Sequence, residues 1–79
     1  MRIKAQLGDN NDPNYSQMAY AVVSDNLWNK YKNLDEDNDD DYWTKRNEYW
    51  DILCTAMGRQ NRLPVDWYVE KDFEEAEQW

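Results

Sequence analysis

The stretch DPNYSQMAYAVVSDN, residues 12–26, decides the fold, because its pattern fits either a helix or a strand. In the helical interpretation Asp12 is the N-cap and Pro13 takes the first helical position, where its missing N–H is not needed. The apolar residues at helical spacing are then Tyr15, Ala19, Val22, Val23, Leu27, Tyr31 and Leu34. A helix here would make the protein an all-α arrangement of three helices.

In the strand interpretation, residues 18–23, MAYAVV, form a β-strand of β-branched and aromatic residues. Ser24 or Asp25 then caps a shorter helix over residues 26–34. We favour this interpretation, because Ser24, Asp25 and Asn26 in succession are poor residues for a helix interior and good residues for a helix cap. The sequence alone leaves both interpretations open.

The N-terminus supplies a partner for such a strand. Residues 1–7, MRIKAQL, alternate between apolar and polar side chains, with Ile3, Ala5 and Leu7 on one side. This period of two is typical of a half-buried strand. The turn-forming residues 8–14, GDNNDPN, end it. If the opening stretch is a strand, the two strands form an N-terminal hairpin.

The clearest helix is predicted from about Asp41 to Met57. Its larger apolar residues return on one side at helical spacing, and they are Tyr42, Tyr49, Trp50, Leu53, Cys54 and Met57. Gly58 stands where a C-cap glycine is expected, so we expect the helix to end just before this residue.

The C-terminal segment again allows two interpretations. Residues 65–70, VDWYVE, read as a short strand. Residues 71–79 then read as a helix, with Asp72 as the N-cap and Glu75 as its partner in a capping box. A competing apolar pattern would make residues 64–79 one continuous helix.

Together these elements predict one small α+β domain over residues 1–79, dominated by helices and carrying two or three short strands. The all-α arrangement of three helices is the alternative. A chain of 79 residues has room for a single modest core. Its five Trp, six Tyr and one Phe supply ample apolar area for that core, so most of the chain should be folded.

The composition argues against catalysis. The chain has no histidine, which removes the commonest general base and the commonest metal ligand. Cys54 lies in the packing stripe of the predicted helix, where a thiol is a structural residue rather than a nucleophile. Two glycines, Gly8 and Gly58, cannot form a glycine-rich phosphate loop. We therefore expect no enzymatic activity, no catalytic residues, no cofactor and no metal site.

The run NLDEDNDDDYW, residues 33–43, is the most unusual feature. It offers calcium ligands at the spacing of an EF-hand loop, namely Asp37, Asp39, Asp41 and Glu48. However, Tyr42 stands where the loop needs glycine for its sharp turn, and Lys45 places a cation at the ninth position. Calcium binding of the EF-hand kind is therefore not expected.

Two interpretations of the acidic run remain. In the first, residues 35–41 are a solvated loop between two helices, and the last Asp residues cap the second helix and favour its positive dipole end. In the second, the charges complement a basic partner, because six carboxylates packed together cost self-repulsion and contribute little to folding.

The aromatic residues divide between core and surface. Trp50, Tyr49, Tyr20, Trp67 and Phe73 are expected in the core. Three further tryptophans stand among polar and charged residues and are expected to be partly exposed, and they are Trp28, Trp43 and Trp79. Exposed rings rimmed by charge are the usual anchors of a protein interface.

The net charge of −8 limits the choice of partner. Such a chain should be repelled by nucleic acid and by anionic membranes, and its natural partner is a basic protein surface. No apolar run approaches the roughly 20 residues that span a bilayer. The start MRIKAQLGD lacks the apolar region of a signal peptide, so we expect a cytoplasmic protein.

In size and composition the whole chain resembles the small inhibitors that phages and mobile elements encode against host defence systems, the anti-CRISPR and anti-restriction proteins. It is short, acidic, free of histidine and rich in aromatic residues, and we expect it to be complete from Met1. The resemblance implies a non-enzymatic inhibitor that acts as a DNA mimic in the bacterial cytoplasm. It would occupy the basic nucleic-acid groove of a host protein or ribonucleoprotein complex and block target engagement.

The partner-binding residues expected from this interpretation form two groups. The first consists of Asp35, Glu36, Asp37, Asp39, Asp40 and Asp41, with Tyr42 and Trp43 beside them. The second is an acidic face of Glu70, Asp72, Glu74, Glu75 and Glu77. The alternative function is a small structural or assembly module, such as a homodimer, in which the acidic charge serves solubility.

Overall fold

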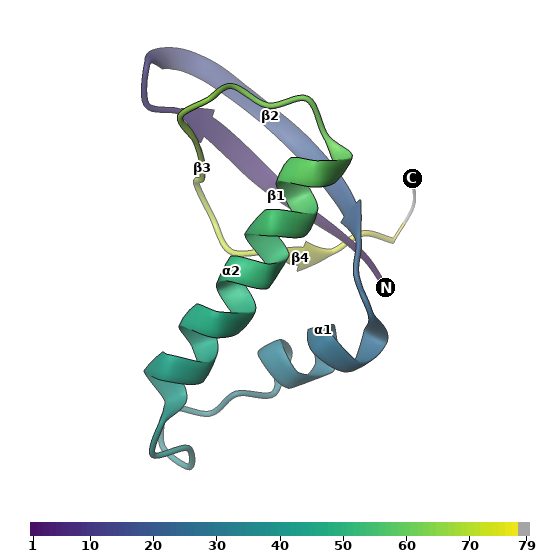
Figure 1. Cartoon of the computed structure of the whole chain (residues 1–79), viewed down its shortest axis with the longest axis vertical. Helices are drawn as coiled ribbons and strands as arrows, with labels where there is room; N and C mark the ends of the chain where they lie inside the picture. Colours follow the sequence, from purple (N-terminus) through teal and green to yellow (C-terminus); the bar gives the residue numbers. More distant parts are fainter. Residues whose placement is uncertain (78–79) are drawn as a thin grey trace.

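The hairpin interpretation of the N-terminal third is correct. The structure, a computed structural model, describes residues 1–77 (Figure 1). Its elements in chain order are β1 (Arg2–Asp9), β2 (Asp12–Val22), α1 (Asp25–Lys32), α2 (Tyr42–Gln60), β3 (Trp67–Val69) and β4 (Glu74–Glu75). They form a small α+β domain with an antiparallel sheet, and the all-α alternative is wrong.

Strand β1 is the centre of the sheet. On one side it pairs with β2 along its whole length, for example Ile3 with Ala21 and Leu7 with Gln17. On the other side it pairs with β3 and then with β4, which follow one another along the same edge. Four residues lie between Val69 and Glu74, whereas only two lie between their partners Leu7 and Lys4 on β1, so the outer strand bulges between β3 and β4.

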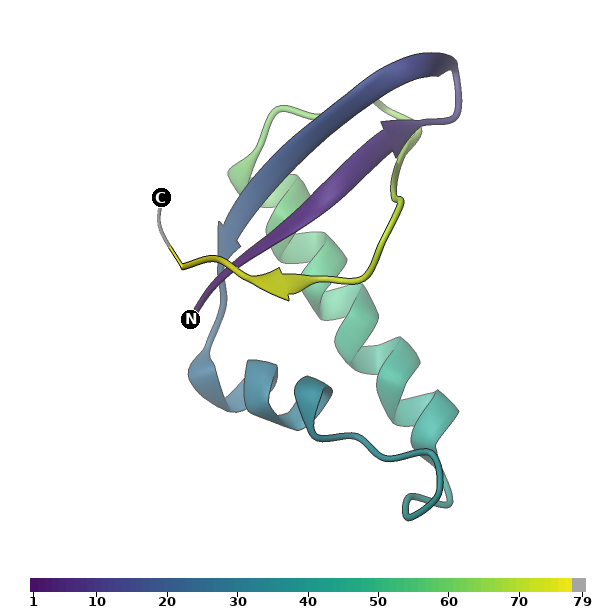
Figure 2. The same cartoon turned by 180° about the vertical axis from the view of Figure 1, so that it is seen from behind.

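The apolar alternation of β1 fixes which face of the sheet is buried. Ile3, Ala5 and Leu7 are fully or almost fully buried, together with Ala19 and Ala21 on β2. Helix α2 lies across this face. Figure 2, from the opposite side, shows the sheet in front of α2, so the other face of the sheet carries no helix.

Helix α1 begins at the cap that the sequence predicts. The Ser24 hydroxyl accepts a hydrogen bond from the backbone N–H of Leu27 at 3.1 Å, which satisfies one of the free donors at the helix start. The helix then buries Trp28 and Tyr31 against α2 and Phe73. Trp28 is only 3% exposed, so the expectation of an exposed Trp28 is wrong.

Helix α2 supplies the largest part of the helical core. Leu53 and Met57 are fully buried, and truncating either to alanine should cost about 2–5 kcal/mol. The predicted end at Gly58 is wrong, because the helix continues to Gln60 and its C-cap is Asn61. The reason is tertiary, since the side chains of Gln60 and Asn61 hydrogen-bond to the backbone of β2.

The C-terminal segment is extended rather than helical. Both helical predictions, residues 71–79 and residues 64–79, are wrong over the part that the structure describes, and Gln78 and Trp79 lie outside it. The backbone of this segment pairs with the open edge of β1, as shown by the hydrogen bonds from Glu70 N to Gln6 O and from Ala76 N to Arg2 O, both 2.9 Å.

The uncovered face of the sheet has its own close contact. An added Cβ on Gly8 would lie 2.5 Å from the ring of Tyr68 and 2.8 Å from the carboxylate of Glu70. Glycine is therefore needed at this position for the ring to lie flat on the sheet. Tyr20, expected in the core, also lies on this face and is 37% exposed, so that prediction is wrong.

Candidate functional site

The acidic run forms the loop between α1 and α2, which we call the acidic loop, residues 35–41. Figure 1 shows it at the end of the molecule opposite the β1–β2 turn. Five of its six carboxylate residues are exposed, and Asp39 is half-buried. The six negative charges therefore gather at one end of a molecule whose longest dimension is 39 Å.

Hydrogen bonds within the acidic loop give it a defined shape. The Asp39 carboxylate accepts from the backbone N–H of Asp35 at 3.0 Å, and the Asp35 carboxylate accepts from the N–H of Asp37 at 2.9 Å. Asp39 N also donates to Asp35 O at 2.9 Å. A loop held by its own side chains loses less conformational freedom when it binds a partner.

The charges in the acidic loop fall into two kinds. Asp35, Asp39 and Asp41 hold the loop or pair with Lys45, whose ammonium lies 3.3 Å from Asp41 and 4.0 Å from Asp39. The Asp41 hydrogen bond and charge raise the pKa of Lys45. By contrast, Glu36, Asp37 and Asp40 make no side-chain hydrogen bond or ion pair among the described residues. Their three carboxylates are exposed to solvent.

The acidic loop does not act as a cap for α2. Asp41 is the N-cap residue, but its side chain makes no capping hydrogen bond, and the first turn of α2 carries no acidic residue. The capping role that the solvated-loop interpretation gave to the last Asp residues is therefore absent from the hydrogen bonds of residues 1–77.

Two rings stand directly beside the acidic loop, at the start of α2. Tyr42 and Trp43 contact each other edge to face, with ring centroids 5.0 Å apart. Trp43 is 58% exposed, which is unusual for so large an apolar side chain. The expected exposure of Trp43 is confirmed, and the first predicted group lies together in space.

The second predicted group does not form a uniform acidic face. The Asp72 carboxylate accepts hydrogen bonds from the Tyr31 hydroxyl and from the N–H of Phe73. Glu75 accepts from the Trp28 indole N–H and from Lys32, each at 3.0 Å. All five members of this group are exposed, but Glu70, Glu74 and Glu77 make no side-chain hydrogen bond or ion pair among the described residues.

These hydrogen bonds shift two pKa values in opposite directions. The bond from Trp28, then the bond and charge of Lys32, lower the pKa of the Glu75 carboxyl. Burial, reinforced by the bond to Asp72, raises the pKa of the Tyr31 hydroxyl well above its usual range. Tyr31 therefore stays protonated and acts as a hydrogen-bond donor.

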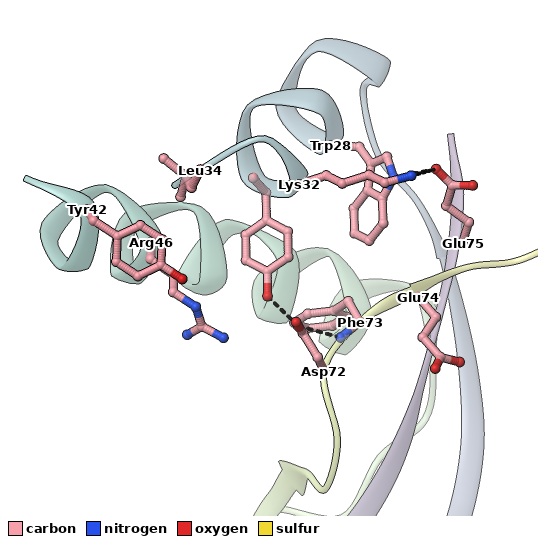
Figure 3. A pocket seen from close by; sticks show the side chains of 10 residues that line it. Trp28, Lys32, Leu34, Tyr42, Arg46, Asp72, Phe73, Glu74 and Glu75 are labelled. Atoms are coloured by element: carbon pink, nitrogen blue, oxygen red, sulfur yellow. Dashed lines mark hydrogen bonds and ion pairs between the residues drawn. The ribbon is translucent and has the colours of Figure 1, made fainter. Parts of the chain in front are cut away.

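An open groove of about 420 Å³ lies next to the acidic loop. The rings of Trp28, Tyr31 and Phe73 line it. Figure 3 shows Trp28 beside Glu75 and Phe73 beside Asp72, the two carboxylates that hydrogen-bond to these residues. The Arg46 guanidinium lies 5.9 Å from the Tyr31 ring centroid and 5.1 Å from that of Trp50.

Tyr42 and Leu34, the two residues that flank the acidic loop, also line this groove. The groove therefore adjoins both ends of the acidic loop, and Trp43 contacts its lining residue Tyr42. Sequence reasoning missed the groove, because α1, α2 and residues 72–75 each contribute a part of it. The one local indication in the sequence was that Trp28 and Lys32 are four residues apart, because this spacing brings two side chains to the same side of a helix.

Residues that could carry chemistry do not cluster. Among the described residues no group of three or more acidic or cysteine side chains is arranged to hold a metal ion. Burial, with a smaller contribution from Asp51, raises the pKa of the Cys54 thiol to about 11, so little thiolate exists near neutral pH. None of the helices within residues 1–77 has the length and apolar character needed to cross a membrane.

Comparison of the chain with protein-family models, with curated proteins and with solved structures finds no match.

Proposed function

We propose that the protein is a non-enzymatic inhibitor that binds the basic nucleic-acid-binding surface of another protein or ribonucleoprotein. The acidic loop would take the place of a phosphate backbone, and the target could then no longer engage nucleic acid. The observation that supports this proposal is the exposed acidic loop with Trp43 beside it, fixed in shape by its own hydrogen bonds.

The charges of the acidic loop suit arginine-rich and lysine-rich surfaces. Glu36, Asp37 and Asp40 present carboxylates that the fold does not use, and carboxylates bind arginine through two parallel hydrogen bonds. Long-range attraction between opposite charges also accelerates association. Direct binding of nucleic acid is disfavoured instead, because the phosphates repel a chain of net charge −8.

The rings supply the apolar part of such an interface. Trp43 offers an exposed indole, and the neighbouring groove could accept an apolar or aromatic side chain of the partner. Interfaces of this kind commonly depend on a few aromatic anchors surrounded by polar residues. We propose host defence complexes of the bacterial cytoplasm as the targets, on the basis of the resemblance in size and composition to anti-CRISPR and anti-restriction inhibitors.

The proposal can be tested by affinity capture from a bacterial lysate treated with nuclease, which frees nucleic-acid grooves. We expect the tagged protein to retain a nucleic-acid-binding complex in low salt and to release it in high salt, since salt screens the charges. Capture of the same complex at every salt concentration, or of no such complex, would contradict the proposal.

A matched pair of variants then tests the acidic loop itself. The variant Glu36→Gln, Asp37→Asn and Asp40→Asn removes three charges without disturbing the internal hydrogen bonds of the loop. We expect it to weaken binding to the captured complex by about tenfold or more, equivalent to about 1.4 kcal/mol. The control removes three exposed charges outside both predicted groups, at Glu48, Asp51 and Asp66. Equal losses in the two variants would show that net charge, not the acidic loop, determines binding.

A further inference from the structure

The two edges of the sheet differ sharply in charge and regularity. The edge formed by β3 and β4 is short and bulged, and seven of the twelve residues 66–77 are charged. The other edge is β2, with eleven residues, of which Asp12 alone is charged. Charges, bulges and short strands are the usual means of preventing strand pairing between molecules. The β3–β4 edge has all of them, and β2 has almost none.

The backbone groups on the outer edge of β2 can be assigned from the register. Gln6 pairs with Met18, and the C=O of Gln6 accepts from Glu70 on the opposite side of β1. Gln6 and Met18 therefore form a pair without mutual hydrogen bonds, and the N–H and C=O of Met18 point away from β1. The same holds for Ser16, two residues earlier.

The chain itself covers the other half of this edge. The Gln60 amide accepts from Val22 N–H at 2.8 Å and donates to Val22 C=O at 3.0 Å, as a neighbouring strand would. The Asn61 amide donates to Tyr20 C=O at 2.7 Å. No described residue covers Ser16 or Met18 in this manner. The N–H of Asn14 donates to the Asp12 carboxylate at 3.0 Å, so the open edge consists of the backbone groups of Ser16 and Met18 and the C=O of Asn14.

We propose that residues 14–18 of β2 pair with the same residues of a second copy of this chain, as antiparallel strands related by a two-fold axis. This homodimer would join the two sheets into one. The proposal is independent of the function proposed for the acidic loop.

Charge complementarity favours a second copy as the occupant. No charged residue lies between Pro13 and Ser24, so a two-fold pairing brings no like charges opposite each other. A basic partner would instead be attracted to the acidic loop. A two-fold interface needs one surface that complements itself. A neutral strand edge meets this need, because its backbone donors and acceptors can pair with those of an identical antiparallel strand.

The position of the acidic loop also permits this dimer. The acidic loop lies at the opposite end of the long axis from the β1–β2 turn (Figure 1), so pairing near the turn keeps the two acidic loops apart. Repulsion beyond about 10 Å is largely screened at ordinary ionic strength. In this register Ser16 lies opposite its symmetry mate, and the exposed Met18 side chain, at 38%, lies opposite Asn14 of the second copy on the uncovered face of the sheet.

The test is sedimentation of the untagged protein across a concentration series. Because a pairing of about five residues buries little area, we expect a weak dimer that forms between about 10 µM and 1 mM. The variant Met18→Pro removes an N–H that points away from β1, so it should leave the hairpin intact. We expect it to raise the dissociation constant by about tenfold or more. The control, Met18→Val, keeps this N–H and should dimerise within about threefold of the original chain.

Amide hydrogen exchange checks the location. In the original chain and in Met18→Val, the backbone amides at positions 16 and 18 should exchange more slowly as the protein concentration rises. The exchange rate of the Val22 amide, which is bonded to Gln60, should not depend on concentration. Circular dichroism establishes that Met18→Pro is folded, and Ser16→Lys provides a second disruptive variant if it is not. A monomer at about 1 mM, or a dimer that tolerates both disruptive variants, overturns the proposal.

Discussion

At the scale of single residues, the carboxylates of this protein differ in what they do. Glu75 binds the Trp28 indole and Lys32, and thereby ties β4 to α1. Glu74, its neighbour, is exposed and makes no such bond among the described residues. Two adjacent glutamates in the sequence thus have different roles, which the fold assigns.

The ionised Glu75 carboxylate should make the protein less stable at acidic pH than at neutral pH. Its pKa is lowered from an ordinary value of 4.5, so its contribution is present above that pH and is lost as the pH falls through the lower, folded value. We expect the melting temperature of the original chain to fall more steeply below pH 4.5 than that of Glu75→Gln. Thermal unfolding from pH 7 to pH 3 measures this difference.

The neighbouring substitution Glu74→Gln is the control, because it removes the same charge without touching Trp28. Its acid dependence should follow that of the original chain. Identical pH profiles for all three proteins would show that the ionised Glu75 carboxylate contributes nothing to stability.

At the scale of elements, the last turn of α2 is linked to the edge of β2. Gln60 and Asn61 extend the helix past Gly58 and hydrogen-bond to Val22 and Tyr20. These contacts explain why a helix with a glycine near its end does not stop there. They also cover one half of an edge that would otherwise be open along its length.

Gln60→Ala should lower the free energy of unfolding by about 1 kcal/mol, because it removes two exposed hydrogen bonds to the backbone of Val22. Chemical denaturation measures the change. The exposed neighbour Arg59 provides the control, and Arg59→Ala should change stability by no more than about 0.5 kcal/mol. Equal effects of the two substitutions would mean that the Gln60 contact does not stabilise the fold.

At the scale of the whole molecule, a net charge of −8 on 79 residues opposes folding. The acidic loop concentrates much of this charge at one end, where Lys45 neutralises part of it. Compact states of highly charged proteins are destabilised by self-repulsion, and salt reduces this effect.

The melting temperature should therefore rise as sodium chloride increases from about 10 mM to 500 mM, since the screening length falls from about 30 Å to a few Å. The variant Glu36→Gln, Asp37→Asn and Asp40→Asn changes the net charge from −8 to −5. It should melt higher than the original chain in low salt and respond less to added salt. Calorimetry measures both effects, and a melting temperature that falls with salt would contradict this account.

The sequence by itself determined the features that depend on neighbouring residues. The alternation of Ile3, Ala5 and Leu7 predicts β1, and Ser24 predicts the start of α1. The helical stripe through Leu53 and Met57 predicts α2. The acidic loop was also predictable as a loop, because a cluster of like charges favours neither a helix interior nor a core.

The tertiary structure alone decided the features that depend on distant residues. Residues 72–76 have a local pattern suited to a helix, but the open edge of β1, about 70 positions earlier, offers their backbone a better set of hydrogen bonds. Trp28 is buried because α1 meets Phe73, and the groove exists because three segments converge. These contacts also decide which acidic side chains hold the fold and which make no contact. The sequence shows a carboxylate only as a charge, because its hydrogen-bond partners are determined by packing in three dimensions.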